Sequence, residues 1–575
     1  MNNLIYHRPA ILLRLGVLSI QVLMALIIGR NVAGAQSVHW ETHLSGPGTF
    51  ASARTWDLNQ DGVKDVVIAD GREFDSIGNL TALNGVNGAI LWEISRVGEL
   101  FASAQFMKIN GDEYEDVVMA GRLSNLFCVD GLTGDLLWDF DNQQPSGPSG
   151  WLQFYEPKQV MDVSGDGLGD IVVVNGGDPT ALPGDPNRPP GILMLIDASD
   201  GSIINSAIMP DTAESYCSVT VINGQSPSDT YIYFGSGGET VPGSLWKATL
   251  AQLQTNDISG AVELMQGQSK GFIAPPVLAD INSDNTLDIL GVGFEGKISL
   301  INGVTETIEW TFSNSDIETY AVSGIGDFNG DGQLDVASSL NHGVWPVYDY
   351  SVMIMLDGAN GNVLRTDTIG LQVTSPMAYD LDGDDKDEVM ISYQIYDTAN
   401  GVVQAGQAVI HYETGIETMF VNNPGLNIAS SASLDDLDND GDIELIEIHS
   451  ADPDFGFDVQ VWNTGVLIDE PLRWTAYHGT FYDGIYYENP PNPVSVPLRS
   501  GNLETPPLVT YLSDRVEVQL PNKAQNIQVV DLYGKTHSYY PVGLSSISVR
   551  NLATGIYFLS YDVDKSKYTT KLFVK

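Results

Sequence analysis

The sequence predicts an all-β protein: a β-propeller of eight blades, each with four antiparallel strands, followed by a small C-terminal β-sandwich. Three observations support this prediction. A nine-residue acidic loop occurs six times between residues 57 and 444, a short apolar β run follows each copy, and tight turns rich in Gly, Asn and Asp separate the later β runs. Repeated units of a few short strands and one turn pattern are typical of propellers.

The acidic loop is clearest at residues 57–65, which read DLNQDGVKD. Oxygen-bearing side chains stand at loop positions 1, 3, 5 and 9 (Asp57, Asn59, Asp61 and Asp65). Gly62 at position 6 permits the positive φ of a sharp turn. Ca²⁺ takes about six to eight oxygens, from carboxylates and backbone carbonyls, at about 2.3–2.6 Å. Together with the carbonyl of position 7, this loop offers such a set and predicts a calcium site.

Five further loops repeat the spacing, with Asn285 and Asp385 in place of the glycine in two of them. Asx turns without a metal are the alternative interpretation, although six copies in register are hard to explain by turn chemistry alone. We therefore expect about six structural Ca²⁺ sites. The predicted ligands, with position 7 acting through its carbonyl, are Asp57, Asn59, Asp61, Val63, Asp65; Asp162, Ser164, Asp166, Leu168, Asp170; Asp280, Asn282, Asp284, Thr286, Asp288; Asp327, Asn329, Asp331, Gln333, Asp335; Asp380, Asp382, Asp384, Lys386, Glu388; and Asp436, Asp438, Asp440, Asp442, Glu444.

The spacing of the loops predicts the number of blades. The loops begin at residues 57, 162, 280, 327, 380 and 436, so the first two steps are about twice as long as the later ones. Each long step therefore hides one more unit. One begins at Lys108, whose ammonium we expect to replace the cation, and the other lies near Asn223 and Asp229. The count is eight blades, with seven as the alternative.

These loops, each followed by a short β run, resemble the calcium-binding loops of FG-GAP repeats, the blades of the integrin-α-type β-propeller. The resemblance covers about residues 38 to 490; it implies the fold and structural calcium but no particular activity. We assign residues 36–488 to the propeller. Residues 38–40 are expected to add a strand to the last blade, and residues 474–488 are expected to end that blade.

Composition excludes one class of partner and indicates export. Asp and Glu outnumber Lys and Arg by 74 to 26, which gives a net charge of −48, so nucleic acid is not an expected partner. Residues 1–35 have the pattern of a signal peptide: Arg8 and Arg14, an apolar run over residues 17–28, and Ala33-Gly34-Ala35 before the expected cleavage. No further segment is apolar enough to span a membrane. The two cysteines, Cys128 and Cys217, are interpreted as buried thiols, with a disulfide as the alternative.

A proline-rich linker over residues 489–507 precedes a small β domain over residues 508–575. Residues 530–535, 551–559 and 570–575 of this domain resemble the C-terminal sorting domain of type IX secretion cargo. The resemblance implies contact with the type IX secretion machinery, and a secreted or cell-surface location. An ordinary immunoglobulin-like accessory domain is the alternative.

The expected function is that of a secreted or cell-surface calcium-binding propeller that binds a glycan or protein, as in adhesion. The long connections opposite the acidic loops carry the candidate ligand-contacting aromatic residues, because long loops on a rigid scaffold commonly bind ligands. The alternative is an extracellular polysaccharide-degrading enzyme, similar to calcium-binding propeller lyases. We name no catalytic or cofactor-binding residue. The ligand-face candidates are Trp151, Phe154, Tyr155, Trp345, Tyr348 and Tyr350.

Overall fold

The structure is a computed structural model of the 575-residue chain. It describes residues 37–490 and 508–574, apart from short internal gaps. The expected signal peptide and most of the expected linker lie outside these residues, as do Trp151 and Trp345. The gaps are 47, 72–76, 141–151, 179–180, 182–183, 345–346, 371–373, 398–401, 425–429, 451–455, 469, 512–515, 520–524, 532–535, 541–545, 550–554 and 564–565.

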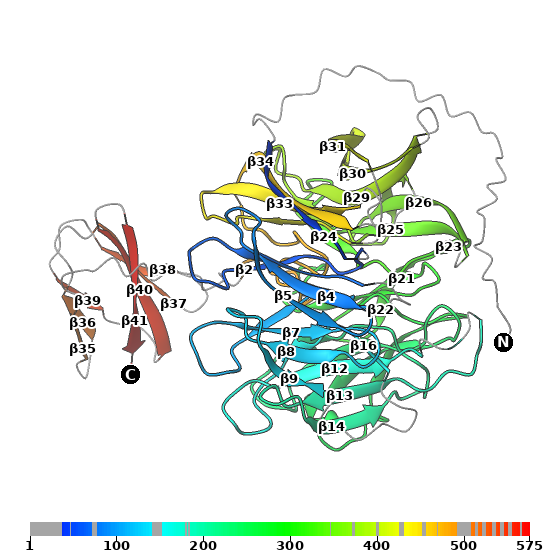
Figure 1. The fold of residues 1–575 in the computed structure, drawn as a ribbon, viewed down its shortest axis with the longest axis horizontal. Helices are drawn as coiled ribbons and strands as arrows, with labels where there is room; N and C mark the ends of the chain where they lie inside the picture. The colour runs from blue at the N-terminus through cyan, green and yellow to red at the C-terminus, as the bar shows by residue number, and fades with distance from the viewer. Residues whose placement is uncertain are drawn as a thin grey trace.

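Eight antiparallel sheets follow one another around a common axis, which confirms the eight-bladed propeller (Figure 1). The innermost strand of most blades has three residues, and it leads into the acidic loop where one is present, directly or, in blade 3, after two residues. The second strand is almost entirely buried, as in β3 (Asp65–Ala69) and β7 (Asp116–Ala120). A continuous apolar run suits such a strand because neighbouring blades cover both of its faces.

The first four blades occupy residues 54–266. Blade 1 consists of β2 (Arg54–Trp56), β3, β4 (Gly78–Leu83) and β5 (Ile90–Arg96). Blade 2 consists of β6 (Gln105–Met107), β7, β8 (Leu126–Val129) and β9 (Leu136–Asp139). Blade 3 consists of β10 (Gln153–Phe154) and β11 (Lys158–Gln159), which share the inner position, then β12 (Ile171–Gly176), β13 (Ile192–Ile196) and β14 (Ile203–Ile208). Blade 4 consists of β15 (Thr220–Ile222), β16 (Tyr231–Gly235), β17 (Ser244–Thr249) and β18 (Val262–Gln266), with the short helix α1 (Leu250–Leu253) before β18.

The last four blades occupy residues 277–467 and one strand from the start of the chain. Blade 5 consists of β19 (Val277–Ala279), β20 (Asp288–Val292), β21 (Ile298–Ile301) and β22 (Ile308–Phe312). Blade 6 consists of β23 (Ile317–Glu318) and β24 (Gly324–Gly326) at the inner position, then β25 (Asp335–Val344), β26 (Val347–Leu356) and β27 (Val363–Ile369). Blade 7 consists of β28 (Met377–Tyr379), β29 (Glu388–Asp397), β30 (Val402–His411) and β31 (Gly415–Pro424). Blade 8 consists of β32 (Ser433–Asp435), β33 (Asp442–His449), β34 (Phe457–Leu467) and β1 (Ser37–Leu44).

Blade 8 closes the ring with strands from both ends of the propeller. β1 is its outermost strand and pairs antiparallel with β34, from Ser37 opposite Asn463 to Leu44 opposite Phe457. Figure 1 shows the blue β1 beside β34, which comes from much later in the chain. The expected contribution of residues 38–40 to the last blade is therefore confirmed.

Residues 474–488 do not end the last blade, contrary to our expectation. Blade 8 is complete before the chain reaches them, and they instead contact the inner strands of several blades; we call this segment the axial plug. Short inner strands present an edge of unpaired backbone groups toward the axis, and the plug pairs with some of these groups. Its hydrogen bonds include Ala378 N–H to the Trp474 carbonyl, Leu434 N–H to the Thr475 carbonyl, Leu278 N–H to the Gly484 carbonyl and Tyr486 N–H to the Leu278 carbonyl, all 2.8 Å.

A tryptophan on the outermost strand connects several blades to the next. Its indole N–H donates a hydrogen bond of 2.7 Å to a carbonyl in the tight turn of the following blade, and its ring lies against that turn. The four such bonds run from Trp40 to Gly85, from Trp92 to Gly131, from Trp138 to Ala198 and from Trp310 to Gly358.

The strands after the linker form two antiparallel sheets. One has the order β35-β36-β39 and the other β38-β37-β40-β41. Their bounds are β35 (Leu508–Tyr511), β36 (Val516–Gln519), β37 (Gln525–Asp531), β38 (Thr536–Tyr540), β39 (Ser546–Val549), β40 (Gly555–Val563) and β41 (Ser566–Val574).

Cys128 and Cys217 are both buried free thiols, in agreement with the interpretation that they do not pair. Within the described part of the chain, no helix has the length and apolar character needed to cross a lipid bilayer.

Candidate functional site

The six acidic loops share one backbone conformation. Positions 4 and 6 have positive φ in every copy, whether the residue is glycine, as at Gly62 (φ 92°), or not, as at Gln60 (φ 56°). Asn285 and Asp385, which replace the glycine of position 6, adopt φ values of 66° and 65°. The in-register spacing of the sequence therefore corresponds to one repeated loop shape.

The first and last carboxylates of a loop hold its backbone in place. Asp57 accepts hydrogen bonds from the backbone N–H groups of Asp61 (3.1 Å) and Gly62 (3.0 Å). Asp65 accepts from Leu58 in the loop (3.1 Å) and from Gly85 in the tight turn of the same blade (3.0 Å). The acidic loops and the tight turns therefore lie on the same face of the propeller.

Two loops bring carboxylates closest together. The groups Asp380, Asp382, Asp384 and Asp436, Asp438, Glu444 each offer ligand atoms within 4.8 Å of one another. A histidine that we did not predict from the sequence lies beside the first of these loops. His411 Nδ1 lies 3.1 Å from Glu388 Oε1, and His411 forms a further possible ligand group with Asp382 and Glu388. His411 ends β30, so only the pairing of β29 with β30 brings it to the loop.

Burial keeps several position 9 carboxyls poorly solvated. It raises the pKa of Asp65 to about 6, of Asp335 to about 7 and of Glu444 to about 8. In all three loops neighbouring carboxylates add to the effect. A cation bound in the loop would favour the charged carboxylate and would therefore lower these pKa values.

The loop that begins at Lys108 keeps part of this arrangement. Asp116 accepts from the backbone N–H groups of Ile109 (2.8 Å) and Asn110 (2.9 Å), as the position 9 carboxylates do elsewhere. Lys108 Nζ donates to the Glu113 carbonyl at 2.9 Å and lies 3.9 Å from Glu115. The ammonium is thus bound to the loop backbone on its own blade.

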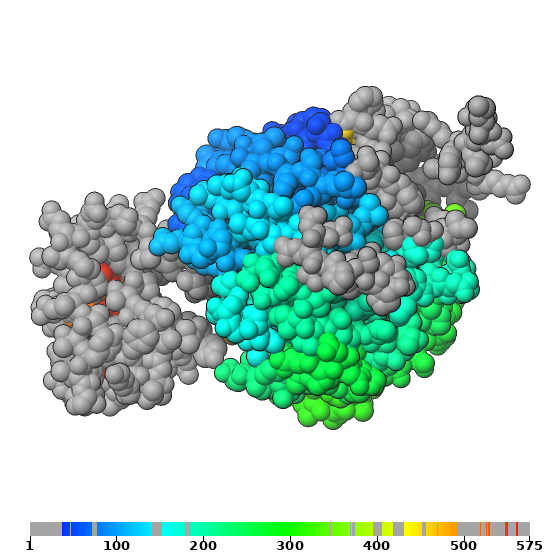
Figure 2. All heavy atoms as spheres, turned by 60° about the horizontal axis from the view of Figure 1, so that its bottom comes forward, coloured from blue at the N-terminus to red at the C-terminus, as the bar shows by residue number. Residues whose placement is uncertain are grey.

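A second candidate site lies at the other end of the inner strands. A pocket of about 510 Å³ is lined by residues that precede the inner strands and by residues of the connections between second and third strands, such as Arg122 and Glu239. Since the inner strands lead from this end into the acidic loops, the pocket opens on the opposite face. We call it the axial pocket. Figure 2 shows the early blades following one another across the surface in chain order, from blue through cyan to green.

The lining of the axial pocket follows the blade repeat. In six blades, the residue seven positions before the first loop position, or its equivalent, lines the pocket, and five of these six residues are aromatic. In blades 3 and 6 this residue falls between the two short inner strands, so the interruption of the strand directs it to the pocket. The six are Phe50, Phe101, Tyr155, Tyr216, Ile273 and Tyr320.

The aromatic rings contact one another across blades. The centroids of Phe101 and Tyr155 are 5.3 Å apart, and Tyr155 meets Tyr216 edge-on at 6.3 Å. On another side of the pocket, Phe294 and Tyr320 stack with an interplanar angle of 17°. Rings in these arrangements stabilise each other beyond simple burial.

Charged groups surround these rings. Arg122 pairs with Glu99, and Arg188 lies 3.8 Å from Glu214 and donates to the Tyr216 hydroxyl at 3.2 Å. Burial raises the pKa of Glu214 to about 7.

The axial plug contributes to the inner end of the pocket. Tyr477 of the plug lines it beside Glu156. Lys158 Nζ lies 2.8 Å from Glu156, and His478 Nδ1 lies 3.8 Å from the same carboxylate. Burial alone would raise the pKa of Glu156, but Lys158 and His478 outweigh it and hold this pKa at about 2. Burial lowers the pKa of the His478 imidazole, while Glu156 acts in the opposite direction.

Of the four predicted ligand-face residues that the structure describes, Tyr155 alone lines the axial pocket. Phe154 is fully buried and meets Phe140 edge-on at 4.8 Å, so we withdraw it as a ligand contact. Its position in β10 explains this, because adjacent residues of a strand point to opposite sides. Tyr348 donates to Glu318 at 3.1 Å, and Tyr350 stacks on His342 at the rim of blade 6.

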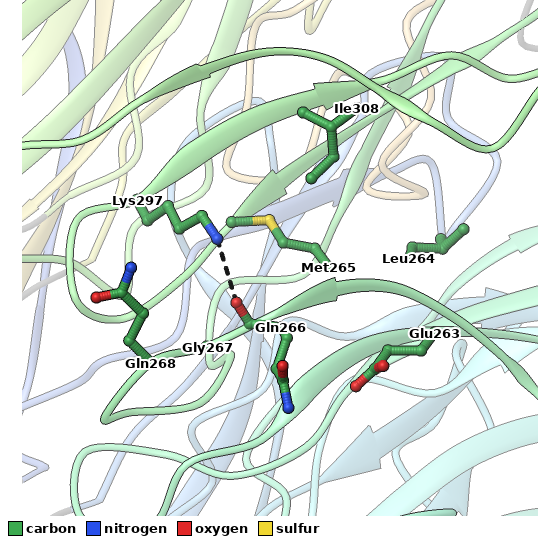
Figure 3. Close-up of a pocket in the computed structure, with 8 residues that line it drawn as sticks. All are labelled: Glu263, Leu264, Met265, Gln266, Gly267, Gln268, Lys297 and Ile308. Atoms are coloured by element: carbon green, nitrogen blue, oxygen red, sulfur yellow. Dashed lines mark hydrogen bonds between the residues drawn. The ribbon is translucent and has the colours of Figure 1, made fainter.

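A separate hollow of about 610 Å³ lies at the outer edge, between blades 4 and 5 (Figure 3). It is formed by β18, residues 267–268, Lys297 and Ile308, and Lys297 donates to the Gln266 carbonyl at 3.2 Å. It contains none of the repeated aromatic residues, and we do not assign it a ligand.

These features define a propeller with acidic loops on one face and an aromatic-lined pocket on the other. A family model for the FAM234A/B beta-propeller matches residues 40–407, more than half of the chain, so the chain belongs to this family. The model for the secretion system C-terminal sorting domain matches residues 512–575. This domain indicates type IX secretion to the cell surface or outside the cell.

Comparison with solved structures gives similar chains at low sequence identity. A europium-containing methanol dehydrogenase has a TM-score of 0.51 and 10% identity, over 74% of this chain and 93% of that one. A quinohemoprotein alcohol dehydrogenase from Pseudomonas putida HK5 has a TM-score of 0.49 and 11% identity, over 76% of this chain and 77% of that one. At 10% identity, the similarity to the methanol dehydrogenase shows the fold alone. No curated protein matches the chain.

Proposed function

We propose that this protein is a secreted binding module whose axial pocket takes part of an extracellular glycan. The observation that carries the proposal is the recurrence of an aromatic residue at the same distance before the first loop position in five blades, with these five residues and the equivalent Ile273 all lining one pocket. Aromatic faces pack against the apolar faces of sugar rings while nearby polar groups bind hydroxyls.

The shape of the site favours a glycan over a folded protein partner. A volume of about 510 Å³ falls within the range of about 300–1,000 Å³ that is usual for small-molecule sites. A stable protein–protein interface usually buries about 800 Å² of surface on each partner, which requires a broad contact surface. A few sugar units of a longer chain suit the axial pocket better.

The proposal includes calcium in the six acidic loops, in agreement with their resemblance to FG-GAP loops. The repeated positive φ values and the convergence of Asp436, Asp438 and Glu444 support this part. The residues would hold the ion through side-chain oxygens and the carbonyl of position 7. The ion would supply positive charge among three or four carboxylates and so stabilise each hairpin. Its role is structural, because the loops lie on the face opposite the pocket.

Binding of the purified protein to a panel of soluble polysaccharides, measured by isothermal titration calorimetry, tests the proposal. The double variant Tyr216→Ala/Tyr320→Ala should bind any polysaccharide identified in this way at least about tenfold more weakly than the unmodified protein does. The reason is that aromatic residues at the centre of a site contribute most of the affinity. Tyr350→Ala, which removes an exposed aromatic ring outside the pocket, is the matched control. Circular dichroism checks that the variants remain folded.

Two results would overturn the proposal. One is a ligand whose affinity is the same for the pocket variant and the control. The other is the appearance of unsaturated products from acidic polysaccharides, which would identify the protein as a lyase and not a binding module.

A further inference from the structure

We propose that the axial pocket recognises a protonated amine carried on a sugar, so that its ligand is a glycan with free amino groups. This inference rests on the proposed function and narrows its ligand class. Three independent observations support it: an excess of negative charge in the walls, a buried carboxylate oxygen without a hydrogen-bond partner, and aromatic rings arranged to receive a cation.

The walls contain more carboxylates than basic groups. The four basic groups in or directly behind them, Arg122, Lys158, Arg188 and Lys270, each face a carboxylate. Among the residues that line the pocket, Glu99, Glu156, Asp178 and Glu239 are acidic, whereas Arg122 and Arg188 are basic. A concave site with a negative excess concentrates cations, so the walls attract a positively charged group and repel a uronate.

Glu239 is placed to contact such a group. Its side chain lines the pocket and, among the described residues, takes part in no hydrogen bond or ion pair. It lies close enough to Tyr216 that, after burial, its charge is the next largest cause of the raised pKa of that phenol. A free carboxylate beside an aromatic ring is a suitable partner for an ammonium group.

A buried oxygen at the inner end of the pocket points to the same kind of ligand. Glu156 is only 2% exposed and lines the pocket, yet its Oε1 has no hydrogen-bond partner; the partners Lys158 and His478 both lie on Oε2. Buried acceptors without a partner are rare because they cost free energy. A ligand N–H or O–H group would remove this cost.

The aromatic rings of the pocket already contact cations of the protein. The Arg122 guanidinium lies 5.4 Å from the Phe101 centroid, and Lys270 Nζ lies 5.1 Å from that of Phe294. Tyr155, Tyr216 and Tyr320 have no such partner among the described residues. Their rings can therefore serve a ligand cation. A lysine side chain alone would fill little of about 510 Å³, whereas an amino sugar presents both a ring to stack and a charge to bind.

The test compares two disaccharides that differ at their amino groups: β-1,4-linked glucosamine with free, protonated amines and its diacetylated form, in which neutral amides replace the amines. Affinities are measured by isothermal titration calorimetry at about pH 6, where amino groups are protonated, and at about 0.15 M salt, which screens long-range attraction to the acidic chain. We expect the free amine form to bind at least about tenfold more tightly. Glu239→Gln should remove most of this preference, and Glu93→Gln, which changes an exposed carboxylate on β5, should leave it intact.

The outcomes separate this inference from the proposed function. Equal affinities for the two disaccharides, with binding still dependent on Tyr216, would overturn the amine preference and leave the glycan-binding function standing. Loss of binding in both Glu93→Gln and Glu239→Gln would show diffuse attraction to the acidic surface and overturn the inference. Free lysine binding as tightly as the amine disaccharide would overturn the sugar component. Absence of binding by any glycan would overturn both proposals.

Discussion

The indole N–H of Trp92, on the outermost strand of blade 1, donates a 2.7 Å hydrogen bond to the carbonyl of Gly131 in the tight turn of blade 2. The same relationship joins blade 8 to blade 1, blade 2 to blade 3 and blade 5 to blade 6. The turn comes close enough that a Cβ on Gly134 would lie 2.8 Å from the Trp92 ring. Each such contact connects two neighbouring blades, which are separate sheets and are therefore not joined by strand pairing.

Replacing Trp92 with Phe should lower the stability of the propeller measurably. The substitution keeps an aromatic ring but leaves the Gly131 carbonyl without its donor, and an unsatisfied buried acceptor costs about 1–3 kcal/mol. Lost ring volume adds to this cost. Thermal denaturation followed by circular dichroism should show a lower melting temperature. Leu91→Ala, at the neighbouring exposed position, should have a much smaller effect, and an equal effect would contradict the role of the indole.

Alanine at two glycines separates backbone strain from steric contact. Gly62 (φ 92°) has open space around a would-be Cβ, whereas Gly134 (φ 75°) has the Trp92 ring there. Gly62→Ala should cost about 1 kcal/mol, the usual penalty for a left-handed non-glycine residue. Gly134→Ala should cost clearly more. Gly62→Asn should be milder than Gly62→Ala, because Asn285 occupies the same loop position with the same sign of φ. Melting temperatures that reverse the order of Gly62→Ala and Gly134→Ala would refute the steric account.

Removing calcium should destabilise the protein. A ligand that binds only the folded state adds about 2.7 kcal/mol of stability at a hundred times its Kd, and six loops would each contribute. The melting temperature should therefore fall on addition of a chelator and recover when Ca²⁺ is restored. Asp438→Ala should reduce the number of calcium ions bound per chain by one, as measured by atomic emission after dialysis. Asp112→Ala, in the loop that begins at Lys108, should leave the number unchanged.

The Glu156 carboxylate should stabilise the fold only above acidic pH. Its folded pKa of about 2 lies below its unfolded value of 4.5. The folded state therefore binds fewer protons, and the contribution is fully present above about pH 4.5 and disappears as the pH falls toward 2. Glu156→Gln should thus destabilise the protein more at pH 6 than at pH 3, in urea denaturation with calcium in excess.

Glu214 provides the opposite sign for comparison. Burial raises its pKa to about 7, so the folded state favours the protonated form, and stability is lost as the pH rises from about 4.5 toward 7. The stability of the Glu214→Gln variant relative to that of the unmodified protein should therefore increase as the pH rises from 5 to 8. If both glutamine variants changed in the same direction with pH, the assignment of the two environments would be wrong.

Much of the propeller could be predicted because its signals are local. Asp57, Gly62 and Asp65 lie within nine residues of each other, and their spacing defines a turn and the start of a strand without any distant contact. The recurrence of that spacing predicted the blade count, including the two blades without a full loop. The residue seven positions before the first loop position, which is aromatic in five of the eight blades, was an equally local signal in the sequence, although we did not use it.

The axial pocket and the plug depended on tertiary structure. Phe50 and Tyr320 are far apart in the chain and face one pocket only because the ring closes through β1 and β34. The sequence of residues 474–488 does not indicate that they lie on the propeller axis. Their hydrogen-bond partners are backbone groups of inner strands from several blades, and backbone groups leave no pattern in the sequence. His411 reaches the acidic loop of blade 7 through strand pairing alone.

The sequence by itself determined the repeating unit, because a hairpin and an acidic turn are stabilised by residues a few positions apart. Only the tertiary structure decided which side chains meet on the axis and what fills it, because closing a ring brings together residues that no local interaction relates.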